Sequence, residues 1–460
     1  MPLDANANIK TTHANMPSTE TIRNHRSTTT AVVAPFATAT AETPRLKLVL
    51  MLGAFIALGP LTIDLYLPAL PNIEADLSTT ASAVQLTLTG TLIGLAIGQI
   101  VVGPLSDSFG RRKPLFYGTL IHVLASIACF LAPTIAVLGV ARVVQGIGSA
   151  ATAVVTMAIV RDLYHGRAAA LLLSRLMLVL GVAPVLAPTL GGFVLGITNW
   201  RGVFAVLGVA GVALMALAHF GLQETLPMQR RRRAGAREVA GAYKMLIADR
   251  TFAALVLVSG FSMASMFAYV SGSSFVMQDQ FGLNEQEFGL VFGAGSIWLI
   301  GGTQLSAVLL KRFGLRQILF GSLVASAVSS LALLAVAVAD VGGLAALVVP
   351  LWITLMLTGT AMPTAPAIAL SLHGEAAGTA AALLGAVRYG VGAIAAPFVG
   401  LLGNDAVAMS TVVAVGMVLA LGTLVAGVHR EAGSFDDEAH LNEGALQAQP
   451  MDAMDVVALS

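Results

Sequence analysis

Three ionisable side chains stand inside long apolar stretches of this sequence, where a charge is costly. Asp64 lies near the end of an apolar run that begins at Leu46, and Arg142 and Arg388 lie inside two further runs. A charge at the centre of a bilayer costs at least ~2.5–3.5 kcal/mol on insertion scales, so each of these residues should face a partner or a wet cavity. A carboxyl group in such a place can take up and release a proton. If Arg142 is close, its charge favours the ionised carboxylate, so we assign Asp64 and Arg142 to proton coupling.

Polar residues recur on one face of the predicted helix that contains Arg142. Arg142, Gln145 and Ser149 are followed by two threonines at the same alternating spacing of three and four residues. At about 100° per residue these side chains share one narrow stripe. A later helix repeats the spacing, with Met266 and Tyr269 among its serines. Packed helices also bond through hydroxyl groups, but a guanidinium needs more than packing, so we predict that these stripes line one central cavity.

Two further residues belong to the predicted substrate cavity. Tyr66 follows Asp64 by two positions and suits either a cavity wall or an interface anchor. Arg388 is flanked on its helical face by Gly385 and Gly392, which admit a close helix neighbour or leave room for substrate. A structural ion pair, a contact with a backbone carbonyl and a contact with a ligand are equally consistent with Arg388.

The composition requires a lipid environment. The 460 residues are 57% hydrophobic and only 11% charged, with a mean hydropathy of +0.84, whereas soluble domains are about 25% charged. The apolar residues form repeated long blocks, which is typical of helical proteins that cross the membrane many times. The single cysteine, Cys129, excludes an internal disulfide and a cysteine metal cluster. The sequence has no nucleotide-binding loop, metal-ligand cluster or nucleophile–base pattern, so we predict neither an enzyme nor a bound cofactor or metal.

Twelve apolar segments account for the chain between residues 45 and 428. Each is long enough to cross a hydrocarbon core of about 30 Å as a helix. The flanking stretches 1–44 and 429–460 are polar and are predicted to be disordered tails. The predicted spans are 46–67, 83–103, 114–132, 137–160, 170–195, 202–222, 251–277, 288–310, 317–339, 342–369, 377–402 and 406–428.

The distribution of lysine and arginine predicts how the spans cross the membrane. The loops after the second, fourth, sixth and eighth spans are basic, and the opposite loops carry acidic residues with Arg201 as their single base. Because positively charged loops stay in the cytoplasm, we expect both termini there. The loop between the tenth and eleventh spans carries no such signal.

The most charged connection, 223–250, divides the chain into two halves. We predict a basic cytoplasmic linker here, between six-helix sets that cover 45–222 and 251–428. The stretches SFGRRKPL and RFGLRQIL follow the second and eighth spans, at equivalent places in the two sets. Two similar six-helix halves around a central cavity are typical of transporters that work by alternating access.

The loop after the second span carries a family signature, GPLSDSFGRRKPL, which resembles the loop motif of the major facilitator superfamily. Gly103 lets two helices approach and Gly110 permits a tight turn. Asp107 can pair with Arg111 or Arg112, or sit at a helix amino terminus. In that superfamily the motif latches the two halves together on the cytoplasmic side, so the resemblance implies a latch here.

Two more motifs narrow the resemblance. ARVVQGIGSA, which contains Arg142 and Gln145, is similar to the helix 4 motif of the drug:proton antiporters in the superfamily. GVAPVLAPTLGG is similar to their helix 5 antiporter motif, whose prolines and glycines bend the helix and allow close packing, but it has Ala187 before its second proline in place of the common glycine. The residues of this motif are Gly181, Pro184, Pro188, Gly191 and Gly192.

Four landmarks resemble one subfamily, the Bcr/CflA drug-resistance transporters: IDLYLPALP, NWRGVF, FAYVSGSSFVMQDQFGLN and GTAAALLGAVRYGVGA. The resemblance covers residues 45–428. It implies an all-α, twelve-helix transporter of the bacterial inner membrane that works as a monomer and without a cofactor. It also implies efflux of small, chemically mixed drugs, such as bicyclomycin, sulfonamides and chloramphenicol-type compounds, in exchange for protons. Arg388 stands where a neutral polar residue is more usual in the subfamily.

Two other functions share parts of this pattern. A dedicated exporter of one metabolite, such as an amino acid or a vitamin, has the same architecture and is separated from drug efflux only by a panel of substrates. A membrane receptor that binds a ligand without moving it is the third interpretation, although the tails contain no recognisable output domain. The arginine run 230–233 suits a topology signal and a contact with anionic lipids rather than with nucleic acid.

Overall fold

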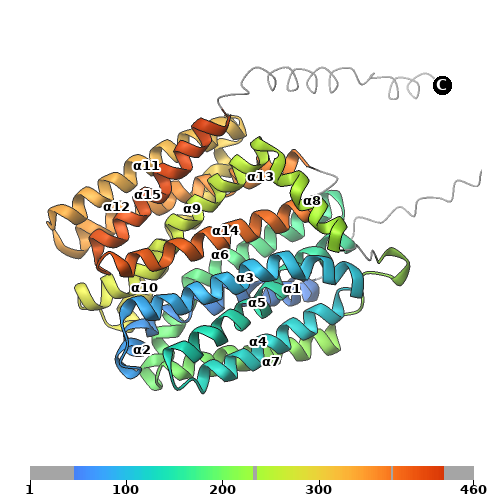
Figure 1. Ribbon diagram of the computed structural model, residues 1–460, viewed down its shortest axis with the longest axis horizontal. Coiled ribbons are helices and arrows are strands. Elements are labelled where there is room, and N and C mark those ends of the chain that lie inside the picture. The colour runs from blue at the N-terminus through green and yellow to red at the C-terminus, as the bar shows by residue number, and fades with distance from the viewer. Residues whose placement is uncertain (1–45, 232–235, 374–376, 429–460) are drawn as a thin grey trace, which may run out of the picture. The chain divides into compact units, whose positions relative to one another are not determined.

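The computed structural model of the protein describes residues 46–231, 236–373 and 377–428, and these residues form helices and short connections without a strand (Figure 1). Twelve of the helical segments are long and apolar enough to cross a membrane. The predicted all-α fold with twelve spans is therefore confirmed. The predicted tails, 1–44 and 429–460, lie outside the described residues.

The N-terminal half of the chain forms the first six spans. Its first span is interrupted, because α1 ends at Asp64 and is followed by a 3-10 turn, η1, and a short helix, α2. The elements are α1 (Leu46–Asp64), η1 (Leu67–Ala69), α2 (Leu70–Asp76), α3 (Ala81–Phe109), α4 (Arg112–Phe130), α5 (Ile135–Leu163), α6 (Gly166–Ile197) and α7 (Trp200–Gly221).

The C-terminal half forms the other six spans. The predicted linker before it contains a short turn, η2, and a helix, α8, which the apolar pattern does not reveal. The elements are η2 (Met228–Arg230), α8 (Ala236–Ala248), α9 (Arg250–Phe275), η3 (Val276–Gln280), α10 (Glu285–Leu309), α11 (Leu315–Ala339), α12 (Gly343–Ala361), α13 (Thr364–Ser371), α14 (Ala377–Leu401) and α15 (Ala406–Val428).

Short polar residues fix where several spans begin. The side chains of Thr80 and Thr134 accept hydrogen bonds from the first-turn backbone N–H groups of α3 and α5. Asn284 and Glu287 form a capping box at the start of α10. These caps satisfy N–H groups that have no partner inside a helix.

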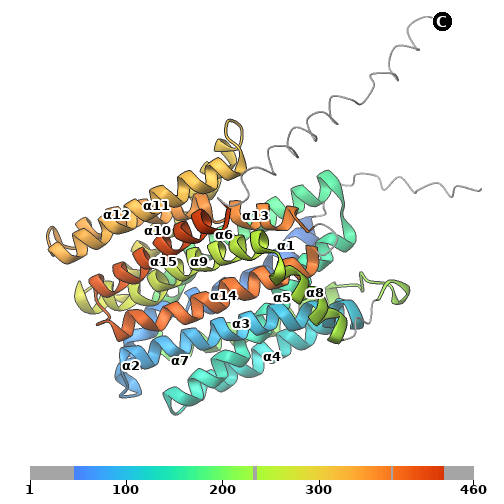
Figure 2. The same cartoon turned by 45° about the horizontal axis from the view of Figure 1, so that its top comes forward.

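The two halves meet along two pairs of helices. α3 packs on α14, and α6 packs on α10; Figures 1 and 2 both show α3 beside α14, although they are far apart in sequence. A Cβ added at Gly192 of α6 would lie 2.6 Å from the carbonyl oxygen of Glu285 in α10. A Cβ added at Gly289 would lie 2.9 Å from the carbonyl oxygen of Pro188. Glycine therefore lets the backbones of α6 and α10 touch.

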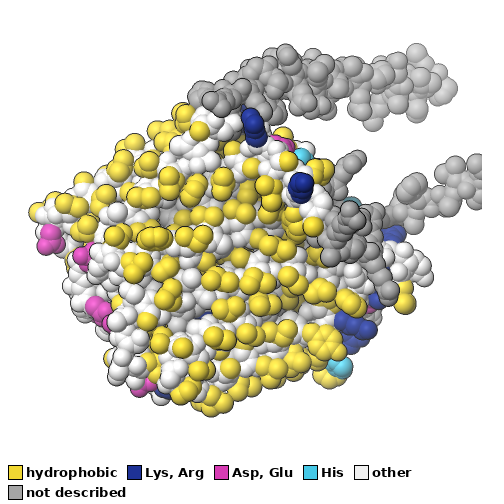
Figure 3. Space-filling view, in the orientation of Figure 1, with side chains coloured by type: hydrophobic (Ala, Val, Ile, Leu, Met, Phe, Trp, Pro, Cys, Tyr) yellow, Lys and Arg dark blue, Asp and Glu magenta, His cyan; other side chains and the backbone are white. Residues whose placement is uncertain are grey.

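Charged side chains gather at opposite ends of the helices. Figure 3 shows the acidic side chains mainly at one end and the lysines and arginines mainly at the other. We name the first the acidic end; it holds the connections from α2 to α3 and from η3 to α10, with Glu74, Asp76 and Glu285. The basic end holds the connections from α3 to α4 and from α7 to α8, with Arg111 and Arg112.

Candidate functional site

Arg142 of α5 is fully buried inside the N-terminal half. Its Nη1 donates hydrogen bonds to the carbonyl oxygen of Thr62 in α1 at 3.0 Å and to Oε1 of Gln145 at 2.6 Å. The guanidinium lies over the rings of Tyr66 and Phe204, 4.4 and 5.7 Å from their centroids. Its Nε and Nη2 have no hydrogen-bond partner among the described residues. Aromatic faces and two oxygens, rather than a carboxylate, therefore hold this charge.

A buried polar network surrounds this guanidinium. Gln145 donates from Nε2 to Oγ of Ser126 in α4 at 2.8 Å. Oγ of Ser149 lies 3.2 Å from Oγ1 of Thr62 and 3.1 Å from Nδ1 of His122. Since Gln145 and Ser149 are fully buried, the predicted cavity residues of α5 pack inside the N-terminal half in this conformation. Their contact with a substrate stays a prediction.

Asp64 stands apart from this network. It is the last residue of α1, its side chain is buried, and it forms no hydrogen bond or ion pair with another described residue. No ion pair joins Arg142 to Asp64 in this conformation; Arg142 donates to the carbonyl oxygen of Thr62, two residues earlier, so the influence of Arg142 on the charge of Asp64 stays a prediction.

Three other predicted cavity residues lie on either side of the contact between the halves. Tyr66 is a wall of the Arg142 site, and its Oη lies 2.7 Å from Oγ1 of Thr87. Tyr269 of α9 stacks on Phe292 of α10, with ring centroids 5.1 Å apart. Met266, one helical turn before Tyr269, is half-buried against the same apolar core. Tyr269 therefore joins α9 to α10, whereas Tyr66 belongs to the Arg142 site of the N-terminal half.

The glycines beside Arg388 admit close neighbours. A Cβ at Gly385 would lie 3.0 Å from the side chain of Gln99 in α3, and one at Gly392 would meet the ring of Phe267 in α9. We predicted that these glycines either admit a close helix neighbour or leave room for substrate. In this structure they admit close helix neighbours. Arg388 itself lines a small hollow between α14, α9 and the α12–α13 break.

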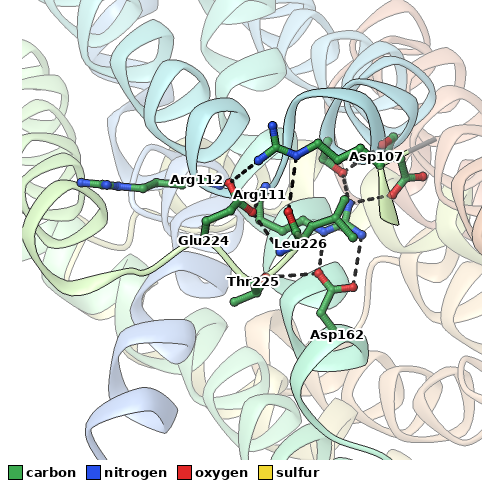
Figure 4. A network of polar contacts seen from close by, with 10 residues as sticks. Asp107, Arg111, Arg112, Asp162, Glu224, Thr225 and Leu226 are labelled. Carbon is green, nitrogen blue, oxygen red and sulfur yellow. Dashed lines mark hydrogen bonds and ion pairs between the residues drawn. The ribbon is translucent and has the colours of Figure 1, made fainter. Parts of the chain in front are cut away.

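Arg111 is the centre of an ion-pair cluster at the basic end (Figure 4). Its guanidinium donates to Asp107 at 2.6 Å and to the two oxygens of Asp162 at 2.7 and 3.2 Å. The backbone N–H groups of Arg111 and Arg112 donate to the carboxylate of Glu224, at 2.8 and 3.3 Å. Burial disfavours the charged form of Arg111, but the hydrogen bonds and charges of Asp162 and Asp107 outweigh it and raise the pKa of Arg111 above its ordinary value. The guanidinium therefore stays charged.

The two glycines of the loop motif have different surroundings. Gly110 has a φ of +89°, and a Cβ there would lie 2.7 Å from the carboxyl carbon of Glu224. The predicted tight turn is confirmed, and it requires glycine. Gly103 has no heavy atom within 4 Å of an added Cβ, so the prediction that it permits close helix approach is wrong.

The partners of Arg111 lie in the N-terminal half and the linker rather than across the two halves. Asp162 is near the end of α5, and Glu224 follows α7. The latch implied by the family resemblance is therefore not made by these ion pairs in this conformation. Sequence reasoning missed Asp162 and Glu224, although each is an acidic residue beside a basic loop, which is the signal that could have found them.

The first part of the helix 5 motif lies along the middle of α6. The helix is continuous through Pro184 and Pro188. Ser296 of α10 donates a hydrogen bond to the carbonyl oxygen of Pro184 at 3.3 Å. A Cβ at Gly181 would lie 3.3 Å from the side chain of Ile300. This part of the motif packs against α10, as the predicted close packing requires.

The last part of the motif lies near the acidic end. A Cβ at Gly191 would meet the backbone of Leu65, just after the end of α1. Gly192 faces the backbone of Glu285. The two glycines thus place α6 in contact with both α1 and α10.

The hydrogen bonds between described residues of the two halves lie at the acidic end or along the adjoining contact of α6 with α10. Ser274 and Gln278 donate to the carbonyl oxygens of Leu67 and Pro68, at 2.7 and 3.3 Å. Similar bonds join Asn72 to Glu285 (3.2 Å), Gln286 to Gly192 (3.0 Å), Gln85 to Asn404 (2.6 Å) and Gln85 to Ser271 (3.2 Å). The acidic end is therefore closed. Several of these residues lie within quoted motifs, namely IDLYLPALP, FAYVSGSSFVMQDQFGLN and the helix 5 motif, but the motifs did not predict that these residues join the two halves.

Gly192→Leu is expected to open the acidic end. The new side chain cannot fit against Glu285, and overpacking of this kind costs about 1–3 kcal/mol, which corresponds to a roughly 5- to 150-fold shift between two states. In a background with Cys129→Ala and Ser274→Cys, an impermeant maleimide should label the buried position 274 faster by that factor. Gly301→Leu is the matched control, because its added Cβ meets nothing within 4 Å; equal labelling rates in the two variants would contradict the prediction.

The chain is similar to a large set of membrane transporters. The model of the Major Facilitator Superfamily matches residues 50–397. The chain belongs to this superfamily. The twelve spans and the loop motif around Gly110 agree with that assignment.

Relatives of this superfamily member include proteins named for drug resistance. The MFS-type transporter YdgK of Bacillus subtilis, described as uncharacterised, is 38% identical over 381 residues, 82% of this chain and 94% of the relative. The bicyclomycin resistance protein homolog of Haemophilus influenzae is 29% identical and covers 78% of this chain and 90% of its own. The chloramphenicol resistance protein of Pseudomonas aeruginosa is 32% identical, and the match covers 74% of this chain and 81% of the relative. These matches confirm the resemblance to the drug-efflux branch of the superfamily.

Solved structures of the superfamily share the fold. The xylose transporter XylE of E. coli, in a partially occluded inward-open conformation, matches with a TM-score of 0.65 at 12% identity and covers 82% of this chain and 96% of its own. A bacterial homolog of the human lysosomal transporter Spinster, in an inward-facing conformation, gives a TM-score of 0.63 at 16% identity, with 82% and 93% covered. At these identities the likeness concerns the fold alone.

Proposed function

We propose that this transporter exports small-molecule drugs in exchange for protons by alternating access. The observation that carries the proposal is Asp64, a buried carboxyl group that has no hydrogen-bond or ion-pair partner among the described residues. It is the last residue of α1, just before η1, where Leu67 accepts a hydrogen bond from Ser274 of the C-terminal half. Intramembrane carboxyl groups without a structural partner are typical of proton relays in transporters.

The protonation state of Asp64 determines which conformation of the transporter is favoured. With a proton bound, Asp64 is neutral and can stay buried beside the closed acidic end. After the proton leaves, the carboxylate needs water or a cation, and this favours a conformation in which the carboxylate becomes accessible. A drug that binds only while Asp64 is ionised would then move in one direction and the proton in the other. The proton gradient drives this cycle without a cofactor.

The orientation follows from the charges at the two ends. Because positively charged connections stay on the cytoplasmic side, we place the basic end, with Arg111 and Arg112, in the cytoplasm of a bacterial cell. Both termini then lie there as well, and the chain works as a monomer in the inner membrane. In this orientation the closed acidic end faces outward, so the conformation is one of the states between inward-open and occluded.

The substrates follow from the named relatives. One relative is named for bicyclomycin resistance and another for chloramphenicol resistance. We propose that the present chain exports compounds of these two kinds, and sulfonamides as well. These compounds are small and chemically mixed, which suits adaptable apolar walls with few polar groups.

Proteoliposomes with a pH difference across the membrane test the proposal. For one-to-one exchange, a difference of ~1 pH unit can hold an accumulation of up to about 10-fold. Labelled chloramphenicol, bicyclomycin or a sulfonamide should accumulate toward that ratio on the more acidic side, and a protonophore should abolish the accumulation. If none of the three accumulates while an amino acid or vitamin does, the chain is a dedicated metabolite exporter and drug efflux is wrong.

A further inference from the structure

The span formed by α6 has one charged side chain, Arg175, which the proposed proton site does not use. Arg175 lies four residues inside the apolar stretch Leu171–Ile197, and this stretch contains no aspartate or glutamate. The side chain is exposed and forms no hydrogen bond or ion pair with another described residue. An exposed guanidinium without a partner therefore stands inside a membrane span, where it needs an acceptor from its surroundings.

The face of α6 that carries Arg175 is the face that lipid covers. Its other exposed side chains are apolar, recur at helical spacing and are 41 to 69% exposed: Leu178, Val182, Leu186, Phe193 and Ile197. Gly181 and Gly192, which contact α10, lie about 100–120° round the helix from Arg175. Because an exposed apolar face of a spanning helix is turned to the acyl chains, Arg175 is turned to lipid rather than to the contact between the halves.

The helices packed against α6 offer no free carboxylate at the level of Arg175. These helices are α1, α5, α7 and α10. In α1 the carboxyl group belongs to Asp64, at its last residue, and α10 has its acidic residues in its first turn, so these groups lie toward the acidic end. Asp162 of α5 is held by Arg111 at 2.7 Å, and α7 contains no acidic residue. The acceptor for Arg175 therefore comes from outside these helices.

The length of α6 places Arg175 at the level of lipid headgroups. Gly192, near the end of α6, contacts Glu285 at the acidic end, and α6 ends at Ile197. From Arg175 to Ile197 there are 197 − 175 = 22 residues, which span about 33 Å in a helix. The hydrocarbon core is about 30 Å thick. When Ile197 is at one surface of this core, Arg175 is at the other, and its long stem carries the guanidinium to the headgroups.

We propose that Arg175 binds the phosphate of an anionic phospholipid in the inner leaflet of the membrane. The planar guanidinium matches a phosphate with two parallel hydrogen bonds. Phosphatidylglycerol leaves the charge of this phosphate uncompensated, whereas the choline group of phosphatidylcholine carries an opposite charge. The bound lipid holds the depth of α6, whose glycines contact α10. The choice of leaflet rests on the proposed orientation, but the binding itself requires neither drug efflux nor proton exchange.

A fluorophore next to Arg175 tests this proposal. In a background with Cys129→Ala, Leu178→Cys puts a single thiol one helical turn from Arg175, at a position that is 67% exposed. The full chain, labelled there with bimane, is placed in phosphatidylcholine bilayers that contain either spin-labelled phosphatidylglycerol or spin-labelled phosphatidylcholine. Quenching gives the relative affinity of the two lipids for this place. Phosphatidylglycerol should bind about 5-fold more tightly, as expected for one arginine at a membrane surface.

Three substitutions in this labelled background assign the preference to Arg175. Arg175→Gln should bring the affinity ratio close to one. Arg175→Lys should keep part of the preference, because an ammonium attracts the phosphate but lacks the planar fork. Lys311→Gln is the matched control, since it removes an exposed base between α10 and α11, outside the spans; it should leave the preference intact.

A second label position keeps the test valid if the Arg175 variants fold poorly. Ile197→Cys places the thiol on the same face of α6, 69% exposed, at the far end of the helix. With Arg175 unchanged, the preference for phosphatidylglycerol should be present at position 178 and absent at position 197.

The proposal is overturned by equal quenching at position 178, by a preference of the same size at position 197, or by a preference that survives in Arg175→Gln. Weak quenching by both lipids would mean that a second copy of the chain or another protein covers this face, and the lipid site would be wrong. The assay contains neither drug nor a pH difference. Failure of drug efflux therefore leaves the lipid site standing, and failure of the lipid site leaves the proposed efflux standing.

Discussion

Asp64→Asn is expected to abolish drug accumulation driven by a pH gradient while the protein still folds and binds drug. Asparagine keeps the size and polarity of the side chain but carries no titratable proton. Since Asp64 forms no hydrogen bond or ion pair with a described residue, the change breaks no contact of the folded chain. In proteoliposomes, accumulation should fall to the level measured without a gradient. Exchange of labelled for unlabelled drug, which moves no net proton, should persist.

Asp340→Asn is the matched control for this variant. Asp340 is exposed at the end of α11 with a φ of +48°, a left-handed conformation that asparagine adopts readily. The Asp340→Asn variant should accumulate drug to the same level as the unchanged protein. If Asp64→Asn also accumulates drug to the full level, Asp64 is not the proton carrier. Loss of drug exchange in Asp64→Asn would instead assign the residue to drug binding.

Arg111→Gln is expected to destabilise the basic end strongly. The Arg111 guanidinium is 6% exposed and holds Asp162, which is 16% exposed, at 2.7 Å. Removing the cation leaves a largely buried carboxylate without its counter-ion, and breaking such a pair costs about 3 kcal/mol or more. The melting temperature of the purified protein should fall by several degrees, and transport should fall with it. Because the pKa of Arg111 is raised, the stabilisation should persist at alkaline pH in the unchanged protein.

A second change distinguishes the ion pair from other effects of the substitution. Arg111→Gln combined with Asp162→Asn removes both charges, so the double variant should melt higher than Arg111→Gln alone. Lys113→Gln, at an exposed position in the first turn of α4, should melt as the unchanged protein does. A melting temperature for Arg111→Gln equal to that of Lys113→Gln would contradict the role of the cluster.

The spans could be predicted well because their signals are local. Lipid requires apolar surfaces of a fixed length, and the predicted span 377–402 corresponds to α14 (Ala377–Leu401). Pro60 and Pro68 lie four residues before and after Asp64 and favour a helix that bends or ends near it, and α1 ends at Asp64. The turn at Gly110 follows from a backbone conformation that glycine adopts most easily.

Contacts between distant segments are not contained in such local signals. The period of the α5 stripe predicts that Gln145 and Ser149 share a face, but not that this face meets α1 and α4 inside one half. The bond between Gln85 and Asn404 joins two ordinary polar residues from opposite ends of the sequence. The linker helix α8 is also missed, because it is too short and too polar to register as a span.

The interruption of the first span places Asp64 close in sequence to contacts that close the acidic end. Asp64 ends α1, and the very next turn supplies the carbonyl oxygens of Leu67 and Pro68 that hold Ser274 and Gln278 at the closed end. Only three to four residues therefore separate Asp64 from the carbonyl groups that help to close the acidic end. If Asp64 carries the proton, as proposed above, a change of its charge acts on these contacts through the short break that contains η1 rather than through the length of α1.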